Sequence, residues 1–175
     1  EFGIDMGRVR ITATDTGKVP NTSATAASSG SDLNGMAVKN AVDQIKDRIA
    51  RLVAVDEVKP KDVVFADGKV IAGNTVLTFE EAAKMAHENR ISLSATGFYA
   101  TPDISWDRTI GKGHPFYYFA HGAAIPEVVI DTLTGENKIL RVDILHDVGQ
   151  SLNPAVDVGQ IEGGFVQGAG WLTTE

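Results

Sequence analysis

Two strand-like apolar segments, residues 116–130 and 138–148, constrain the fold of this chain more than any other feature of the sequence. Both are rich in β-branched or aromatic residues, the types enriched in strands. The connection at 132–136 contains a glycine, which suits a tight reversal of the chain. We therefore expect the two segments to pair as an antiparallel ribbon.

Helical periodicity appears earlier, at residues 34–52. Apolar side chains recur there at intervals of three and four residues, which places them on one helix face. Ser31 or Asp32 is the expected N-cap, because a short side-chain oxygen can accept a hydrogen bond from a free amide of the first turn. The apolar residues are Val38, Ala41, Val42, Ile45, Ile49 and Leu52.

Two further helices are indicated by the residues at which they begin. The sequence Thr-Phe-Glu-Glu at 78–81 is typical of a capping box and predicts a short helix to about residue 89. Asn153 followed by Pro154 matches the preferences of an N-cap and a first helical position. A helix is expected from there toward residue 172.

Shorter strands complete the predicted fold. Alternation of apolar and polar residues indicates a strand at 8–14, and another is expected at 93–101, followed by a loop with Trp106 and residues 111–113. Residues 62–78 are typical of a hairpin, since Asp67-Gly68 suits a type I′ turn. The fold class is α+β, with a mixed or antiparallel sheet and packed helices.

The composition excludes several classes of function. The 175 residues are 43% hydrophobic, enough for a sizeable core, and their net charge of −7 disfavours nucleic-acid binding. The sequence contains no apolar run long enough to predict a membrane span. Cysteine is absent, which excludes disulfides and cysteine-ligated clusters and fits a reducing, cytoplasmic location.

The chain is expected to be one fragment, 1–175, of a larger domain. It opens without a Met, and Glu1, Phe2 and Gly3 are candidates for vector-derived residues. An apolar, glycine-rich stretch precedes Glu175, where a terminal segment would ordinarily be polar. No internal repeat is present.

Residues 19–35 are the first candidate binding segment. The loop is rich in Ser, Thr, Ala and Gly and leads into the predicted helix at 34–52. Small side chains let a ligand approach the backbone, and a helix start offers free N–H groups to an anionic or heteroatom-rich ligand. A solvated linker with an ordinary N-cap is the alternative interpretation.

Residues 147–170 are the second candidate segment. Five glycines follow Pro154 within the expected helix, although each costs about 1 kcal/mol relative to alanine. Close approach of a cofactor or of another helix would explain them. Gln160 and Gln167 share a helix face, where a primary amide can bind the edge of a heterocycle or simply face solvent.

These segments together resemble the molybdopterin-binding large subunit of the xanthine dehydrogenase and aldehyde oxidase family. The similarity extends along nearly the whole chain from Arg8. Ser-Ala-Thr-Gly-Phe-Tyr at 94–99 and Pro-Phe-Tyr-Tyr-Phe at 115–119 are most similar to xanthine dehydrogenases, bacterial ones especially. The resemblance implies a molybdenum-cofactor-binding type of domain.

The resemblance also implies which residues contact the molybdenum–molybdopterin cofactor. They are Thr25, Ala26, Ala27, Ser28, Ser29, Gly30 and Gln160. Ala27 would lie nearest the metal, where its methyl group leaves room for substrate. Gln167 is the weaker candidate, and no protein side chain is expected to ligate the metal.

The family hydroxylates purines, related N-heterocycles or aldehydes with oxygen from water, and electrons leave through iron–sulfur clusters and FAD on other domains or subunits. No catalytic residue is assigned, because the family's catalytic glutamate is expected beyond Glu175 and the scattered histidines and carboxylates match no catalytic position. The fragment is expected to be inactive alone, with the rest of the subunit as its partner. A non-catalytic assembly module is the alternative; a phosphate-binding loop is excluded because its motif is missing.

Overall fold

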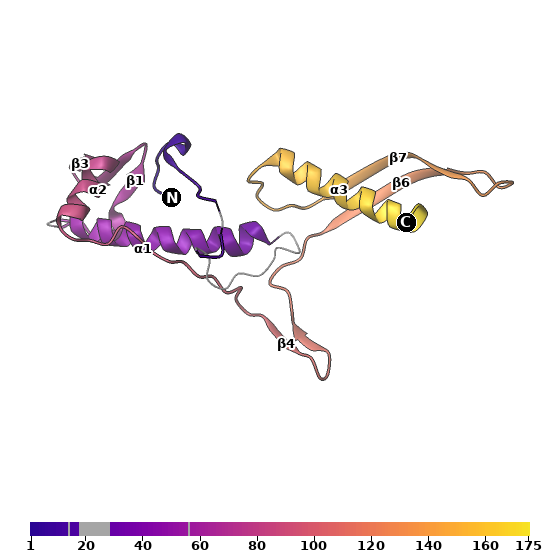
Figure 1. Cartoon of the computed structure of the whole chain (residues 1–175), viewed down its shortest axis with the longest axis horizontal. Coiled ribbons are helices and arrows are strands. Elements are labelled where there is room, and N and C mark those ends of the chain that lie inside the picture. Colours follow the sequence, from indigo (N-terminus) through magenta and orange to yellow (C-terminus); the bar gives the residue numbers. More distant parts are fainter. Residues whose placement is uncertain (14, 18–28, 56) are drawn as a thin grey trace. The chain divides into compact units, whose positions relative to one another are not determined.

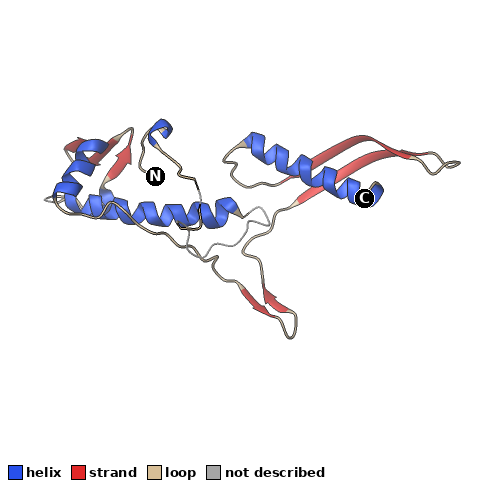
Figure 2. Cartoon of the chain, viewed as in Figure 1, coloured by secondary structure: helices blue, strands red, loops and turns tan. Residues whose placement is uncertain are grey.

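The computed structural model shows an α+β chain of helices and antiparallel strands (Figures 1 and 2). It describes residues 1–13, 15–17, 29–55 and 57–175. These form two compact units, Glu1–Pro102 and Asp103–Glu175. The predicted fold class is confirmed, and every strand pairing among the described residues is antiparallel.

The first unit combines two helices with a small sheet. A 3-10 turn, η1, covers Met6–Arg8, and a π-helical turn, η2 (Gly30–Gly35), leads directly into α1 (Met36–Val53). A second 3-10 turn, η3, covers Pro60–Asp62. Then follow β1 (Val64–Ala66), β2 (Lys69–Ala72), β3 (Thr75–Thr78) and α2 (Phe79–Glu88).

The predicted hairpin at 62–78 is confirmed and gains a third strand. Asp67 and Gly68 have φ angles of 49° and 70°, as a type I′ turn requires, and β1 pairs with β2 across them. The chain reverses again near Gly73, whose φ is 59°, so that β3 pairs with the other edge of β2. This second turn, near Gly73, was not predicted from the sequence.

The core of the first unit lies where α1, β2 and α2 meet. Its fully buried members are small or β-branched, and they come from one face of each element. The amphipathic face predicted for residues 34–52 is confirmed in its second half, where Ile49 is only 1% exposed and Ile45 and Leu52 pack against the core, whereas Val38 is 63% exposed. The buried residues are Ile49, Val53, Val70, Ala72, Ala82 and Ala86.

The sequence predicted the N-cap of α2 correctly and that of α1 incorrectly. The capping box of α2 is confirmed, since Thr78 and Glu81 exchange side-chain and backbone hydrogen bonds. The expected N-cap of the longer helix, Ser31 or Asp32, is wrong. Both residues already lie inside η2, because the backbone begins to coil at Gly30.

Neither of the two further strands expected in the first unit belongs to a described ladder. In the segment 8–14, Arg8 belongs to η1 and Thr14 lies outside the described residues, while residues 9–13 are exposed and pair with no described strand. Residues 93–101 also lie outside any described ladder. The carbonyl groups of residues 92, 94, 96 and 98 instead accept hydrogen bonds from side chains of α1.

The first three residues pack against the sheet and helices of the first unit. Phe2 contacts the rings of Phe65 and Phe79, with centroids 6.4 and 5.3 Å apart. Glu1 forms an ion pair with Lys46, and the carbonyl oxygen of Gly3 accepts a hydrogen bond from Gly68 N at 2.6 Å. These candidates for vector-derived residues therefore make native-like contacts.

The second unit contains a long ribbon and one helix. The ribbon is β6 (Gly122–Ile130) paired antiparallel with β7 (Asn137–His146), as predicted for residues 116–130 and 138–148, although residues 116–121 precede the strand. The expected loop around Trp106 forms a short hairpin, β4 (Ser105–Asp107) with β5 (Lys112–His114). The helix α3 covers Pro154–Thr173.

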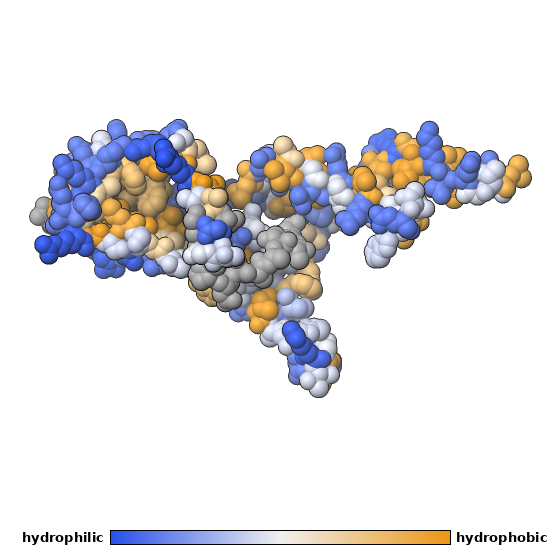
Figure 3. All heavy atoms as spheres, in the orientation of Figure 1, coloured by the Kyte–Doolittle hydropathy of each residue, from blue (hydrophilic) through white to orange (hydrophobic). Residues whose placement is uncertain are grey.

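Apolar side chains of the second unit remain on its surface. All fully buried apolar residues that the structure describes belong to the first unit. In Figure 3, apolar side chains are visible over β6 and β7, which include the exposed Ile125, Val129 and Leu145. A two-stranded ribbon of this kind is marginally stable alone, so its faces need cover from elsewhere.

Candidate functional site

The start of the long helix is one part of the candidate site. Ser29 precedes η2, and its carbonyl oxygen accepts a hydrogen bond from Leu33 N at 3.0 Å. The amide groups of Gly30 and Ser31 have no hydrogen-bond partner within the described part of the chain. A β carbon on Gly30 would meet no atom within 4 Å. The helix start therefore offers two N–H groups and open space to a ligand.

Most of the predicted cofactor loop, namely Thr25, Ala26, Ala27 and Ser28, lies outside the described residues. Ser29 and Gly30 belong to the first unit and Gln160 to the second. Each part is therefore described by itself, and joint binding by the two parts remains a prediction.

The second part of the candidate site is one face of α3. Asn153 caps this helix by accepting a hydrogen bond from Ala155 N, and Pro154 occupies its first turn, as predicted. Gln160 and Gln167, seven residues apart, lie on the same helix face. Small residues and one aromatic share that face: Gly163, Gly164, Gly168 and Trp171. We call these six residues the Gln/Gly face.

The Gln/Gly face has no covering element among the described residues. A β carbon added at Gly163, Gly164 or Gly168 would meet nothing within 4 Å. The glycines thus leave the helix backbone bare beside the two exposed amide side chains. A flat polar molecule can approach such a surface more closely than it could approach a helix covered by larger side chains.

The opposite face of α3 borders an apolar groove with β7. The groove has a volume of about 710 Å³, and its walls are mainly aliphatic and aromatic. Val142 and Ile144 contribute from the strand, and Ile161 and Phe165 from the helix. Gln160 does not line this groove. That α3 has an apolar face and a separate Gln/Gly face was not predicted from the sequence. The apolar residues spaced at three and four between 154 and 166 could have revealed it.

Polar groups also line that groove. The Ser151 hydroxyl donates a hydrogen bond to the Asp157 carboxylate, and His146 and Glu162 border the same space. Glu162 thus lies on the groove side of α3, whereas Gln160 does not line the groove. No described set of three His, Asp or Glu side chains is arranged to hold a metal ion.

Other carboxylates have structural roles. Asp143 forms an ion pair with Arg141 at 2.7 Å. Asp131 lies in the turn between β6 and β7 and accepts hydrogen bonds from Leu133 N and Thr134 N. Glu175 borders the Gln/Gly face, where it lines a depression together with Gln167 and Trp171.

The described residues whose pKa values are shifted belong to neither part of the candidate site. The pKa of Glu81 is lowered because its carboxylate accepts hydrogen bonds from the backbone N–H and hydroxyl of Thr78. The pKa of Lys39 is raised by its hydrogen bond with Asp43. These shifts arise from helix capping and surface ion pairing, so they identify no acid or base catalyst.

The chain is α+β, and it presents an uncovered Gln/Gly helix face in one unit and a helix start in the other. A model of the molybdopterin cofactor-binding domain family matches residues 1–175. The chain belongs to this family, which confirms the resemblance inferred from sequence.

Individual relatives agree with this assignment. The chain is 47% identical over 174 residues to a xanthine dehydrogenase/oxidase of Gallus gallus and 45% identical over 177 residues to a xanthine dehydrogenase of Dictyostelium discoideum; each match covers 99% of the chain. An aldehyde oxidase 1 of Oryctolagus cuniculus is 43% identical over 177 residues, covering the whole chain. The chain spans about 12% of the length of these relatives.

The described residues fit a heterocyclic cofactor. The Gln160 side chain offers both a donor and an acceptor for the edge of a heterocycle, and the neighbouring glycines leave space over the helix backbone. The amides of Gly30 and Ser31, which have no partner among the described residues, suit an anionic substituent. None of the described helices combines the length and apolar character needed to cross a bilayer.

Proposed function

We propose that this chain forms one wall of the molybdopterin site in a xanthine dehydrogenase-like hydroxylase. Thr25, Ala26, Ala27, Ser28, Ser29 and Gly30 would contribute the loop and helix start, and Gln160 would contribute the helix face. The observation that carries the proposal is the uncovered Gln/Gly face of α3, where open space lies over three glycines beside an exposed amide.

The chemistry of the full protein would be hydroxylation of a purine, a related N-heterocycle or an aldehyde. When bound, the molybdenum cofactor supplies the redox centre at which oxygen from water is added to carbon. This chain's residues would hold the cofactor and orient it. Gln160 would bind the heterocycle edge through its amide, and the glycines would exclude side-chain bulk.

The rest of the subunit would supply the catalytic base, and iron–sulfur and flavin domains would receive the electrons. These partners are proposed because the chain is similar to much longer relatives and spans only 12% of their length. The proposal includes a cytoplasmic location, with which the absence of cysteine is compatible. The chain alone would be inactive.

The test is molybdenum and pterin analysis of the full-length enzyme, together with xanthine and hypoxanthine hydroxylation. Gln160→Ala should lower cofactor content per folded molecule and lower activity in proportion. Gln167→Ala should have a smaller effect, because Gln167 lies two turns further along the same face. Glu162→Gln, on the groove side of the same helix, is the matched control and should retain cofactor.

Two results would contradict the proposal. Unchanged pterin content in Gln160→Ala would remove this residue from the site. A correctly folded full-length protein that contains neither molybdenum nor pterin would instead favour the non-catalytic assembly module.

A further inference from the structure

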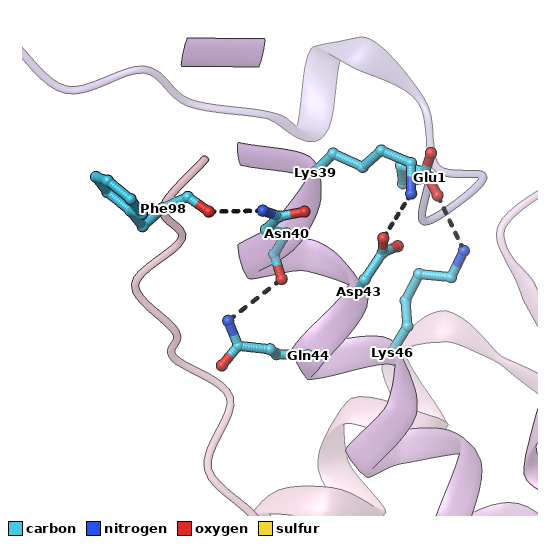
Figure 4. A network of polar contacts seen from close by, with 7 residues as sticks. All are labelled: Glu1, Lys39, Asn40, Asp43, Gln44, Lys46 and Phe98. Carbon is cyan, nitrogen blue, oxygen red and sulfur yellow. Dashed lines mark hydrogen bonds and ion pairs between the residues drawn. The ribbon is translucent and has the colours of Figure 1, made fainter. Parts of the chain in front are cut away.

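The extended segment at residues 92–98 is held along α1 by polar side chains of the helix. Asn40 Nδ2 donates to the carbonyl oxygen of Phe98 at 2.6 Å (Figure 4). Gln44 Nε2 donates to Thr96 O at 3.3 Å. Arg48 Nη1 donates to the carbonyl oxygens of both Ser92 and Ser94, at 3.1 and 2.8 Å. Each donor lies one helical turn from the next.

The spacing of these contacts defines the backbone conformation of the segment. Four helical residues advance about 6 Å, and two residues of a β-strand advance about 6.6 Å. One turn of α1 therefore matches two residues of a strand, as the contacts at residues 94, 96 and 98 require. Carbonyl groups that face the helix at every second residue follow the period of a β-strand, whereas a polyproline helix repeats every three residues.

The position of the segment on the helix is also fixed sterically. Gly97 packs against the backbone of α1, where a β carbon would lie 2.9 Å from Ala41 N. The side chain of Phe98 points away and is 81% exposed. The segment thus runs extended along α1, with one face against the helix and one edge bonded to its side chains.

The other edge of this segment is free. In a β-strand the N–H and C=O groups of successive residues point to opposite edges, so Leu93, Ala95, Gly97 and Tyr99 direct theirs away from the donors of α1. These backbone groups have no hydrogen-bond partner within the described residues. A row of unpaired backbone groups is a template for another strand.

We propose that residues 93–99 are an edge strand that pairs, through this free edge, with a strand from the remainder of the full-length protein. The sequence pattern of residues 93–101 is typical of a strand, yet no described strand pairs with it. The chain spans about 12% of its relatives' length, which leaves ample polypeptide to provide the partner. α1 would hold the edge in a conformation ready for pairing.

The proposal is independent of cofactor binding, so it can be tested with the full-length enzyme whether or not it contains molybdenum. Hydrogen–deuterium exchange with residue-level resolution is the measurement. The amides of Ala95 and Gly97 should exchange at least about tenfold more slowly than those of Ser94 and Thr96, because only the former would lie in the ladder. Protection should not depend on protein concentration.

A pair of proline substitutions gives an independent check. Ala95→Pro removes an N–H group from the free edge, whereas Thr96→Pro removes one from the edge facing α1. Ala95→Pro should accelerate exchange at Leu93 and Gly97 by about tenfold or more, and Thr96→Pro should leave it nearly unchanged.

Three outcomes would overturn the proposal. Exchange at Ala95 and Gly97 as fast as in an open loop would show that the edge is unpaired. Equal protection at residues 94–97 would indicate general burial. Protection that disappears on dilution would assign the edge to a second copy of the protein.

Discussion

Gly97 lies so close to α1 that a β carbon at this position would overlap the carbonyl oxygen of Ala37 and lie 2.8 Å from its carbonyl carbon. The obstacle is helix backbone, which cannot move aside as the end of a flexible side chain can. This contact and the donors of α1 together hold residues 92–98 in place. It also explains why a glycine follows Thr96 in an otherwise strand-like sequence.

Gly97→Ala should therefore destabilise the fold by about 2 kcal/mol or more, because the added methyl group overpacks a rigid contact. Chemical denaturation of the purified protein measures the change. Gly30→Ala is the matched control, since a β carbon there meets no atom within 4 Å and alanine favours a helix. Equal stability of the two variants would contradict the close contact.

Gly164→Ala should separate cofactor binding from helix packing as the reason for the glycines of α3. Alanine stabilises an open helix position by up to about 1 kcal/mol, so the full-length variant should fold at least as well while retaining less pterin. Gly159→Ala lies off the Gln/Gly face and should retain the cofactor. A destabilised Gly164→Ala variant with full pterin content would show instead that another helix packs there.

Thr78→Ala should lower the free energy of unfolding by about 1 kcal/mol, because it removes the side-chain acceptor that caps Glu81 N at 3.1 Å. Urea denaturation midpoints provide the measurement. Thr75→Ala, at the exposed start of β3, keeps the cap intact and should change stability by less than about 0.5 kcal/mol. A smaller loss at Thr78 than at Thr75 would exclude the capping box as a stabilising feature.

The same capping box predicts a loss of stability in acid. Hydrogen bonds from Thr78 lower the pKa of Glu81 below its ordinary value of 4.5, so the unfolded chain binds a proton more readily than the folded protein. The contribution of Glu81 is fully present above that value and is lost as the pH falls through the lower, folded pKa. Unfolding midpoints of wild type and Glu81→Ala should converge as the pH falls through the folded pKa of Glu81, which lies below 4.5. A stability difference that persists undiminished in acid would refute this assignment.

The elements that the sequence predicted well are those whose signals are local. The type I′ turn at Asp67-Gly68 and the capping box at Thr78 depend on residues within four positions of each other. The ribbon of β6 and β7 depends on a short connection that brings its strands together. Such features need no information from distant parts of the chain.

The candidate site was predicted only in part. Gln160 and Gln167 share one face of α3 as expected, because helical periodicity alone determines this. The groove on the opposite face depends on how β7 and the helix lie across the intervening loop. The predicted contacts of Thr25, Ala26, Ala27 and Ser28 remain predictions, because these residues lie outside the described part of the chain.

Sequence by itself thus determined the three α-helices, the type I′ turn at Asp67-Gly68, the long ribbon and the family, because each is encoded in local spacing or in a long run of matched residues. Only the tertiary structure decided where the strand-like residues 92–98 bind. The carbonyl groups of every second residue face one edge, so they can accept hydrogen bonds from any partner that offers donors at intervals of about 6.6 Å. Here the side chains Asn40, Gln44 and Arg48 of α1 provide them, and no local pattern distinguishes a helix from a second strand in that role.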